Sequence, residues 1–181
     1  QYITYALLSY NSDQEVMRVL FPWFVHAVGY YDNVDEKAIQ PFAEEAFLGG
    51  MPLLYFTGTA ENLPPASRED LRQMLEFKKK VDPVLYKMRC RGADGVQAPE
   101  GLRAFTFAGD DALALTFVRA GENAPRRLLL DPVRTGVTTG ATARMLNADG
   151  QPGEALPLAS DGDQVVLDLP DTRFGAVIFQ K

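Results

Sequence analysis

The stretch "GGMPLLYFTG", residues 49–58, determines how the first half of the chain is interpreted. Two glycines precede an apolar run over residues 51–56, and the polar Thr57 and Gly58 follow it. A continuous apolar run of this length is typical of a parallel strand that is buried on both faces. We therefore expect residues 51–56 to form one strand of a sheet whose other strands lie elsewhere.

Helical patterns flank this strand. Residues 39–48 carry an apolar stripe at helical spacing, which Gly49 and Gly50 should end. Ser67 with Asp70 is a helix-start pattern, and the helix should continue to about Leu85, although Pro83 limits its regularity. Two helices are therefore predicted around the central strand.

The N-terminal residues add a strand and a further helical segment. A strand is predicted in "YITYALLSY", residues 2–10, and Ser12 with Glu15 then indicates a helical segment that includes Val28. The order strand, helical segment, helix, strand, helix is α/β in character and implies parallel strands joined by right-handed crossovers. Two parallel strands leave open edges, so we expect residues upstream of Gln1 or another chain to complete the sheet. The chain would then be the remainder of a longer one.

Composition changes near Arg91, after which short alternating apolar runs are divided by turn signals such as "AGDD", "NADG" and "SDGD". Roughly six to eight antiparallel strands would fit this pattern and form a β-sandwich. We expect two domains, 1–91 and 92–181. The phenylalanines of the second domain should be core, which predicts a structural sandwich with no binding site of its own; they are Phe105, Phe107, Phe117, Phe174 and Phe179.

Charge and motifs exclude several classes of function. The net charge is −6, and the one basic run, Lys78 to Lys80, is interpreted as the wet side of a helix, so no nucleic-acid partner is expected. No stretch approaches the ~20 apolar residues of a membrane span. A single cysteine, Cys90, and a single histidine, His26, make a metal site improbable and exclude an internal disulfide. The phosphate-loop and serine-nucleophile motifs are missing as well, which argues against a nucleotide-phosphate site and against serine-nucleophile chemistry. We expect no cofactor.

Three segments carry a resemblance to a known family. They are "GGMPLLYFTG", "SREDLRQMLEFKKKVDPVLYKMRCRG" and "TTGATARMLNADG…VVLDLPDTRFGAVIFQ", which resemble the last barrel strand, the last barrel helix and the closing sandwich strands of a bacterial (β/α)8-barrel glycoside hydrolase of the α-galactosidase-like kind. The resemblance implies the end of a (β/α)8 barrel followed by an antiparallel β-sandwich, with a carbohydrate substrate. It slightly favours a secreted or periplasmic location.

The same resemblance places the chemistry at the carboxyl ends of the barrel strands. Glycosidases commonly use two carboxyl groups, which in related barrels lie on middle strands, so we expect the catalytic pair upstream of Gln1 and this segment alone to be inactive. Substrate-binding residues are expected at the strand ends and after the helical segment: Asn11, Asp13, Tyr31, Asp32, Thr57, Glu61 and Asn62.

Each candidate also has a structural interpretation. Asp13 lies in a helix-start pattern, and Tyr31 with Tyr30 could be packing residues. Glu61 is open between a solvated charge and a substrate contact, whereas His26 is interpreted as a packed helical histidine. Two other functions stay open: a non-catalytic glycan-binding or interaction protein with a β-sandwich, and a transferase or isomerase on the same barrel.

Overall fold

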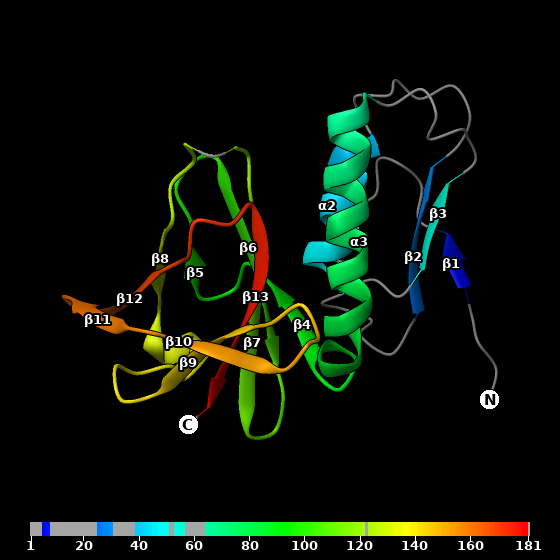
Figure 1. Cartoon of the computed structure of the whole chain (residues 1–181). Helices are drawn as coiled ribbons and strands as arrows, with labels where there is room; N and C mark the ends of the chain where they lie inside the picture. The colour runs from blue at the N-terminus through cyan, green and yellow to red at the C-terminus, as the bar shows by residue number, and fades with distance from the viewer. Residues whose placement is uncertain are drawn as a thin grey trace.

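The computed structural model describes residues 5–7, 25–30, 39–50, 53–56, 64–121 and 123–180. Within them the chain forms a parallel sheet, two helices and an antiparallel sandwich, arranged so that the helices lie between the parallel sheet and the sandwich (Figure 1). No helix in this part of the chain has the length and apolar character needed to cross a membrane.

The parallel sheet has three described strands in the order β1-β2-β3. They are β1 (Tyr5–Leu7), β2 (Val25–Tyr30) and β3 (Leu53–Phe56). Both strand pairs are parallel. The predictions of a strand near the N-terminus and of a strand within residues 51–56 are confirmed.

Strand β2 corrects the sequence interpretation. Residues 25–30 were expected to continue a helical segment with His26 on its flank, but they are extended and pair with both β1 and β3. Val25 and Val28 are β-branched and fit a pleated sheet, whereas Gly29 costs about 1 kcal/mol in a helix interior. Tyr30 therefore ends a strand, and the described sheet has three strands where two were expected.

Helix α2 (Ile39–Leu48) ends at the predicted glycines. The Gly49 amide donates to the Glu45 carbonyl at 2.9 Å, and Gly50 adopts a φ of +57°. A Cβ atom at Gly50 would lie 3.1 Å from the Phe107 ring of the sandwich. Glycine thus ends the helix and also allows its last turn to approach the sandwich closely.

Helix α3 (Pro65–Leu85) begins two residues before the predicted start at Ser67. Pro65 occupies the first helical turn, where its missing N–H has no helical partner to lose, so proline starts this helix in place of a serine cap. Ser67 and Asp70 therefore lie inside the helix. Pro83 is accommodated in the last turn.

The basic run of α3 is only partly solvated. Lys79 and Lys80 are exposed, but Lys78 is buried, and its Nζ donates to Asp82 Oδ2 at 2.5 Å. Tyr86 Oη donates to the same oxygen at 2.8 Å. A buried ammonium group needs such a partner. The prediction that the basic run lies on a solvent-exposed helix face is therefore wrong for Lys78.

The second half is a sandwich of ten described strands, six in one sheet and four in the other, and every pair is antiparallel. The six-stranded sheet has the order β10-β9-β13-β7-β6-β4, with β10 (Pro152–Leu156), β9 (Thr142–Leu146), β13 (Phe174–Gln180), β7 (Ala112–Arg119), β6 (Leu102–Ala108) and β4 (Arg89–Gly92). The four-stranded sheet has the order β11-β12-β8-β5, with β11 (Leu158–Asp161), β12 (Gln164–Asp168), β8 (Arg127–Leu130) and β5 (Val96–Gln97). A single helical turn, α4 (Pro132–Thr135), follows β8.

The six-stranded sheet is covered on both faces. On β7, Leu115 and Phe117 face the four-stranded sheet, whereas Ala114 and Val118 belong to the cluster that contains residues of α2 and α3. The expected core phenylalanines are buried in one cluster or the other, with Phe174 half-buried against the helices. An antiparallel sheet often leaves one face in water, but here the helices occupy that face.

We predict that Phe174→Ala lowers the free energy of unfolding by about 3 kcal/mol, because it opens a cavity between the sheet and both helices. Val133 is 92% exposed, so Val133→Ala should change stability by at most about 0.5 kcal/mol. Urea denaturation of both variants measures the difference. Equal midpoints for the two variants would contradict the shared core.

Candidate functional site

The carboxyl edge of the parallel sheet is the candidate site. Parallel strands end at the same edge, and Tyr30 at the end of β2 is the register partner of Phe56 at the end of β3. Strand β1 runs in the same direction, and its last described residue, Leu7, pairs with Ala27, three residues before Tyr30. The fold therefore brings the ends of β2 and β3 to one edge, toward which β1 also runs, and α/β proteins bind their ligands at such an edge.

The seven predicted substrate-binding residues follow these strand ends in the sequence. Asn11 and Asp13 come after β1, Tyr31 and Asp32 directly after β2, and Thr57, Glu61 and Asn62 after β3. All seven lie outside the described residues, so their roles stay predictions. The topology gives the positions of the described strands, and the seven residues follow these strands in the sequence.

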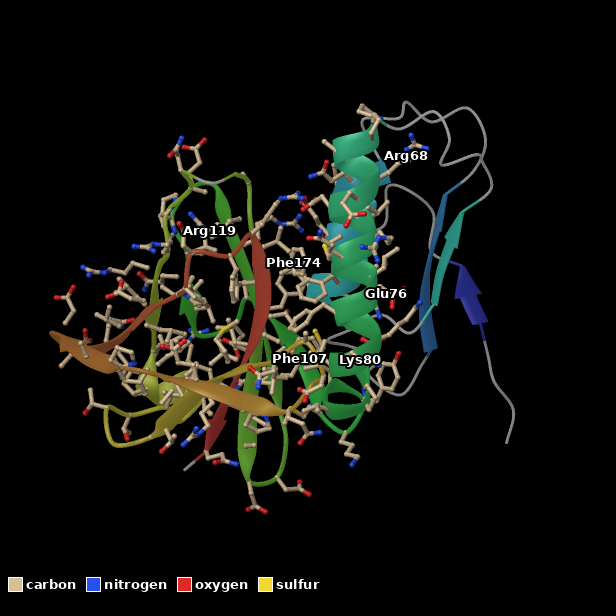
Figure 2. The ribbon with its side chains drawn as sticks, in the orientation of Figure 1. Arg68, Glu76, Lys80, Phe107, Arg119 and Phe174 are labelled. Carbon is tan, nitrogen blue, oxygen red and sulfur yellow. The ribbon has the colours of Figure 1, made fainter. Side chains whose placement is uncertain are left out.

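Two consecutive sandwich residues fix the helices that start from this edge. The Arg173 guanidinium forms ion pairs with Glu44 of α2 and Asp70 of α3. The adjacent Phe174 is the first residue of β13, and its ring packs against both helices (Figure 2). We call Arg173, Phe174 and their helix partners Glu44, Phe47, Asp70 and Phe77 the Arg173–Phe174 hub.

The aromatic part of the hub is a closed triangle. The ring centroids of Phe47 and Phe174 are 5.8 Å apart with planes at 71°, and those of Phe77 and Phe174 are 5.9 Å apart. Phe47 and Phe77 lie 6.0 Å apart. Tilted and edge-on pairs at these separations are favourable beyond the area that they bury. One ring from each helix and one from the sandwich thus form a single packed unit.

Arg119 fixes the chain that carries the hub. Its side chain is 2% exposed, and its Nη1 donates to the Thr172 carbonyl at 3.1 Å and to Asp171 Oδ1 at 2.8 Å. Its backbone amide donates to the Arg173 carbonyl at 2.7 Å. The guanidinium is thus matched by fixed acceptors, and residues 171–173 are held to the end of β7.

Glu44 and Glu45 of α2 both pair with arginines of the sandwich. Glu44 pairs with Arg173, and Glu45 pairs with Arg103 of β6. At the end of the same helix, Thr116 Oγ1 of β7 donates to the Leu48 carbonyl at 2.7 Å. Helix α2 is therefore attached to the sandwich by charge in its middle and by a buried hydrogen bond at its end.

A second concave feature lies on the sandwich. A hollow of about 350 Å³ is lined by residues 93–97 together with Asp131 and Arg134. Asp94 accepts hydrogen bonds from Arg134 Nη1 at 2.9 Å and from Arg91, and Arg134 also pairs with Asp131 at 3.6 Å. The charges satisfy one another, so this cluster joins the β4–β5 turn to α4. Sequence reasoning missed it because its members come from separate turns.

The acidic turns of the sandwich carry no metal site. "NADG" connects β9 to β10 and "SDGD" connects β11 to β12, as predicted for turns. In the part of the chain that the structure describes, no group of three or more His, Cys, Asp or Glu side chains is placed to hold a metal ion.

Comparison with known proteins relates this arrangement to glycoside hydrolases. No family model matches the chain, and no curated protein does. An α-fucosidase from Thermotoga maritima, in complex with a mechanism-based inhibitor, is similar over 98% of this chain and 42% of its own, with a TM-score of 0.53 and 11% identity. A noncanonic maltogenic α-amylase, AmyB, from Thermotoga neapolitana is similar over 93% of this chain and 45% of its own, with a TM-score of 0.56 and 8% identity.

These likenesses show a shared fold. The identities are 11% and 8%, and the chain spans less than half the length of either structure. The chain therefore shares the fold of part of these two structures, and its chemistry is a separate question.

The Asp94 cluster gives a pH-dependent prediction. The hydrogen bond from Arg134 is the main cause that lowers the pKa of Asp94 below its ordinary value of 3.8, and Arg91 contributes further. A carboxylate with a lowered folded-state pKa stabilises the fold above its unfolded pKa and loses this effect as the pH falls through the folded value. Asp94→Asn should therefore cost about 1 kcal/mol at pH 7, and the difference from the wild type should shrink below about pH 4.

Urea denaturation at pH 7 and at several acid pH values measures this change. The matched control is Asp110→Asn at an exposed position of the β6–β7 turn, which should alter stability by at most about 0.5 kcal/mol. A stability loss for Asp94→Asn that stays constant into acid would show that the ion pairs do not stabilise the sandwich.

Proposed function

We propose that this chain is part of a glycoside hydrolase that cleaves O-glycosidic bonds in oligo- or polysaccharides. In this proposal residues 1–91 supply the last units of a (β/α)8 barrel and residues 92–181 form its C-terminal sandwich. The observation that carries the proposal is that the helices following parallel strands pack directly on an antiparallel sandwich, in a fold similar to that of an α-fucosidase and an α-amylase.

The parallel sheet supports the presence of further barrel strands. In the described part of the chain, β1 and β3 each pair with β2 alone, so both outer strands keep an unpaired edge. A barrel removes such edges by closing on itself. The remaining strands would come from a longer chain or from another chain, and they are the main partner in this proposal.

The described carboxylates near the helices support placing the catalytic pair elsewhere. Glu44, Glu45 and Asp70 are paired with sandwich arginines, and Asp82 is paired with Lys78. The acid and nucleophile of a glycosidase must flank the scissile bond, whereas the charges of these four carboxylates already neutralise arginine or lysine side chains. The proposal therefore assigns the two-carboxylate mechanism to residues outside the described set.

The sandwich is proposed to be a support without its own sugar site. Its large aromatic side chains are buried, and the hollow beside Asp94 is lined by neutralised charges. The narrower kinship with α-galactosidases suggested by the sequence also belongs to this proposal, as does the sugar-binding role of the predicted residues.

Assays of the full-length protein test the activity. Nitrophenyl α-L-fucoside, nitrophenyl α-D-galactoside and maltooligosaccharides form the first panel, followed by nitrophenyl glycosides of other sugars. Hydrolysis of at least one glycoside is expected. Binding of oligosaccharides without hydrolysis of any panel member would favour the glycan-binding alternative.

Glu61→Gln tests the proposal that the segment following β3 binds substrate. Glu61 follows β3 in a segment that also offers Thr57 and Asn62, whose polar groups suit sugar hydroxyls, so it should position substrate without transferring a proton. On the glycoside that the full-length protein hydrolyses, we expect KM to rise several-fold, equivalent to ~1 kcal/mol of binding, with kcat nearly unchanged. A loss of several orders of magnitude in kcat with intact folding would make Glu61 a catalytic carboxylate.

A further inference from the structure

We propose that Arg173 of the sandwich is a positioning residue that sets the middle of α2 and the first third of α3 relative to the carboxyl edge of the parallel sheet. The proposal rests on the proposed function, because it assigns the sandwich a defined part in shaping the substrate-binding edge. Arg173 does not contact substrate in this account and acts through the two helices.

The position of its partners along the helices carries the argument. Glu44 is the sixth residue of α2, and Asp70 is the sixth residue of α3. Each helix starts after a parallel strand has ended at the candidate edge, α2 after β2 and α3 after β3. One guanidinium thus holds two successive strand–helix units, at the middle of the ten-residue α2 and in the first third of the 21-residue α3.

The electrostatics make this contact more than an incidental surface pair. The side chains of Arg173, Glu44 and Asp70 are only 23%, 15% and 26% exposed. The planar fork of arginine can bind two carboxylates at once with little loss of conformational freedom. Removing it would leave two partly buried carboxylates facing each other, and their repulsion would separate the helices locally.

Other sandwich contacts act at different points. Arg103 contacts α2 alone through Glu45, and Thr116 holds the last turn of α2 at Leu48. Phe174 packs on both helices without supplying charge. Among the contacts described for these two helices, the Arg173 ion pairs therefore join the middle of α2 and the first third of α3 to one point of the sandwich, a point that Arg119 in turn fixes.

Hydrogen exchange on the full-length protein tests the proposal with Arg173→Gln, Arg173→Lys and a matched control. The control is Arg127→Gln, which removes an exposed ion pair with Asp168 inside the sandwich. In Arg173→Gln, amides in the middle of α2 and in the N-terminal half of α3 should exchange roughly tenfold faster, while those of β6 and β7 stay unchanged. Arg173→Lys keeps the charge but lacks the fork, so it should give an intermediate increase.

The kinetic readout separates positioning from a purely structural role. On the glycoside that the wild type hydrolyses, Arg173→Gln should raise KM roughly three- to tenfold with a smaller change in kcat, and Arg127→Gln should match the wild type. Unchanged exchange in both helices, or equal acceleration throughout the sandwich, would overturn the proposal. The exchange experiment needs no substrate, so it decides the role of Arg173 even if the proposed hydrolase activity fails.

Discussion

The contact between the Arg173–Phe174 hub and the two helices is the constraint on which the rest of the arrangement depends. Two adjacent residues supply a charge and a ring, and each finds one partner on α2 and one on α3. This contact joins elements that are as many as 129 residues apart in sequence. It explains why the six-stranded sheet is buried on both faces and why the helices are covered on the side away from the parallel strands.

This arrangement gives a physical reason for a sandwich to accompany strand–helix units. A binding site at a strand edge is only as well defined as the helices that hold the strands and their connections. The helices here are anchored to a rigid antiparallel sheet by a shared apolar core, by ion pairs and by the Thr116 hydrogen bond. In our proposal the sandwich contributes to the candidate site through these helices.

Local patterns in the sequence were sufficient for much of the fold. The apolar run before Thr57 predicted a parallel strand, the stripe ended by Gly49 and Gly50 predicted α2, and alternation after Arg91 predicted an antiparallel sandwich. Strand β2 was missed because its valines also fit helical spacing, and a single sequence does not show that β1 and β3 lie beside it. Pairing with β1 and β3 makes residues 25–30 a strand, although their apolar spacing also fits a helix.

The ion-pair partners of the charged helix residues could not be predicted from the sequence. Glu44, Glu45 and Lys78 fit a solvated helix face by spacing. In the structure the two glutamates pair with arginines of the sandwich, and Lys78 is buried beside Asp82 of its own helix. The predicted site residues from Asn11 to Asn62 depended on the resemblance and on strand order. The structure supports the common edge from which they continue, and their contacts with sugar stay predictions.

A crystal structure of the full-length protein soaked with a competitive monosaccharide inhibitor tests the central claim most directly. The account predicts the sugar at the carboxyl edge of the parallel sheet, in contact with residues that follow β1, β2 or β3, and no sugar on the sandwich. A sugar bound to the sandwich, for instance in the hollow beside Asp94 and Arg134, with the strand edge empty, would contradict the account and make the sandwich the functional domain.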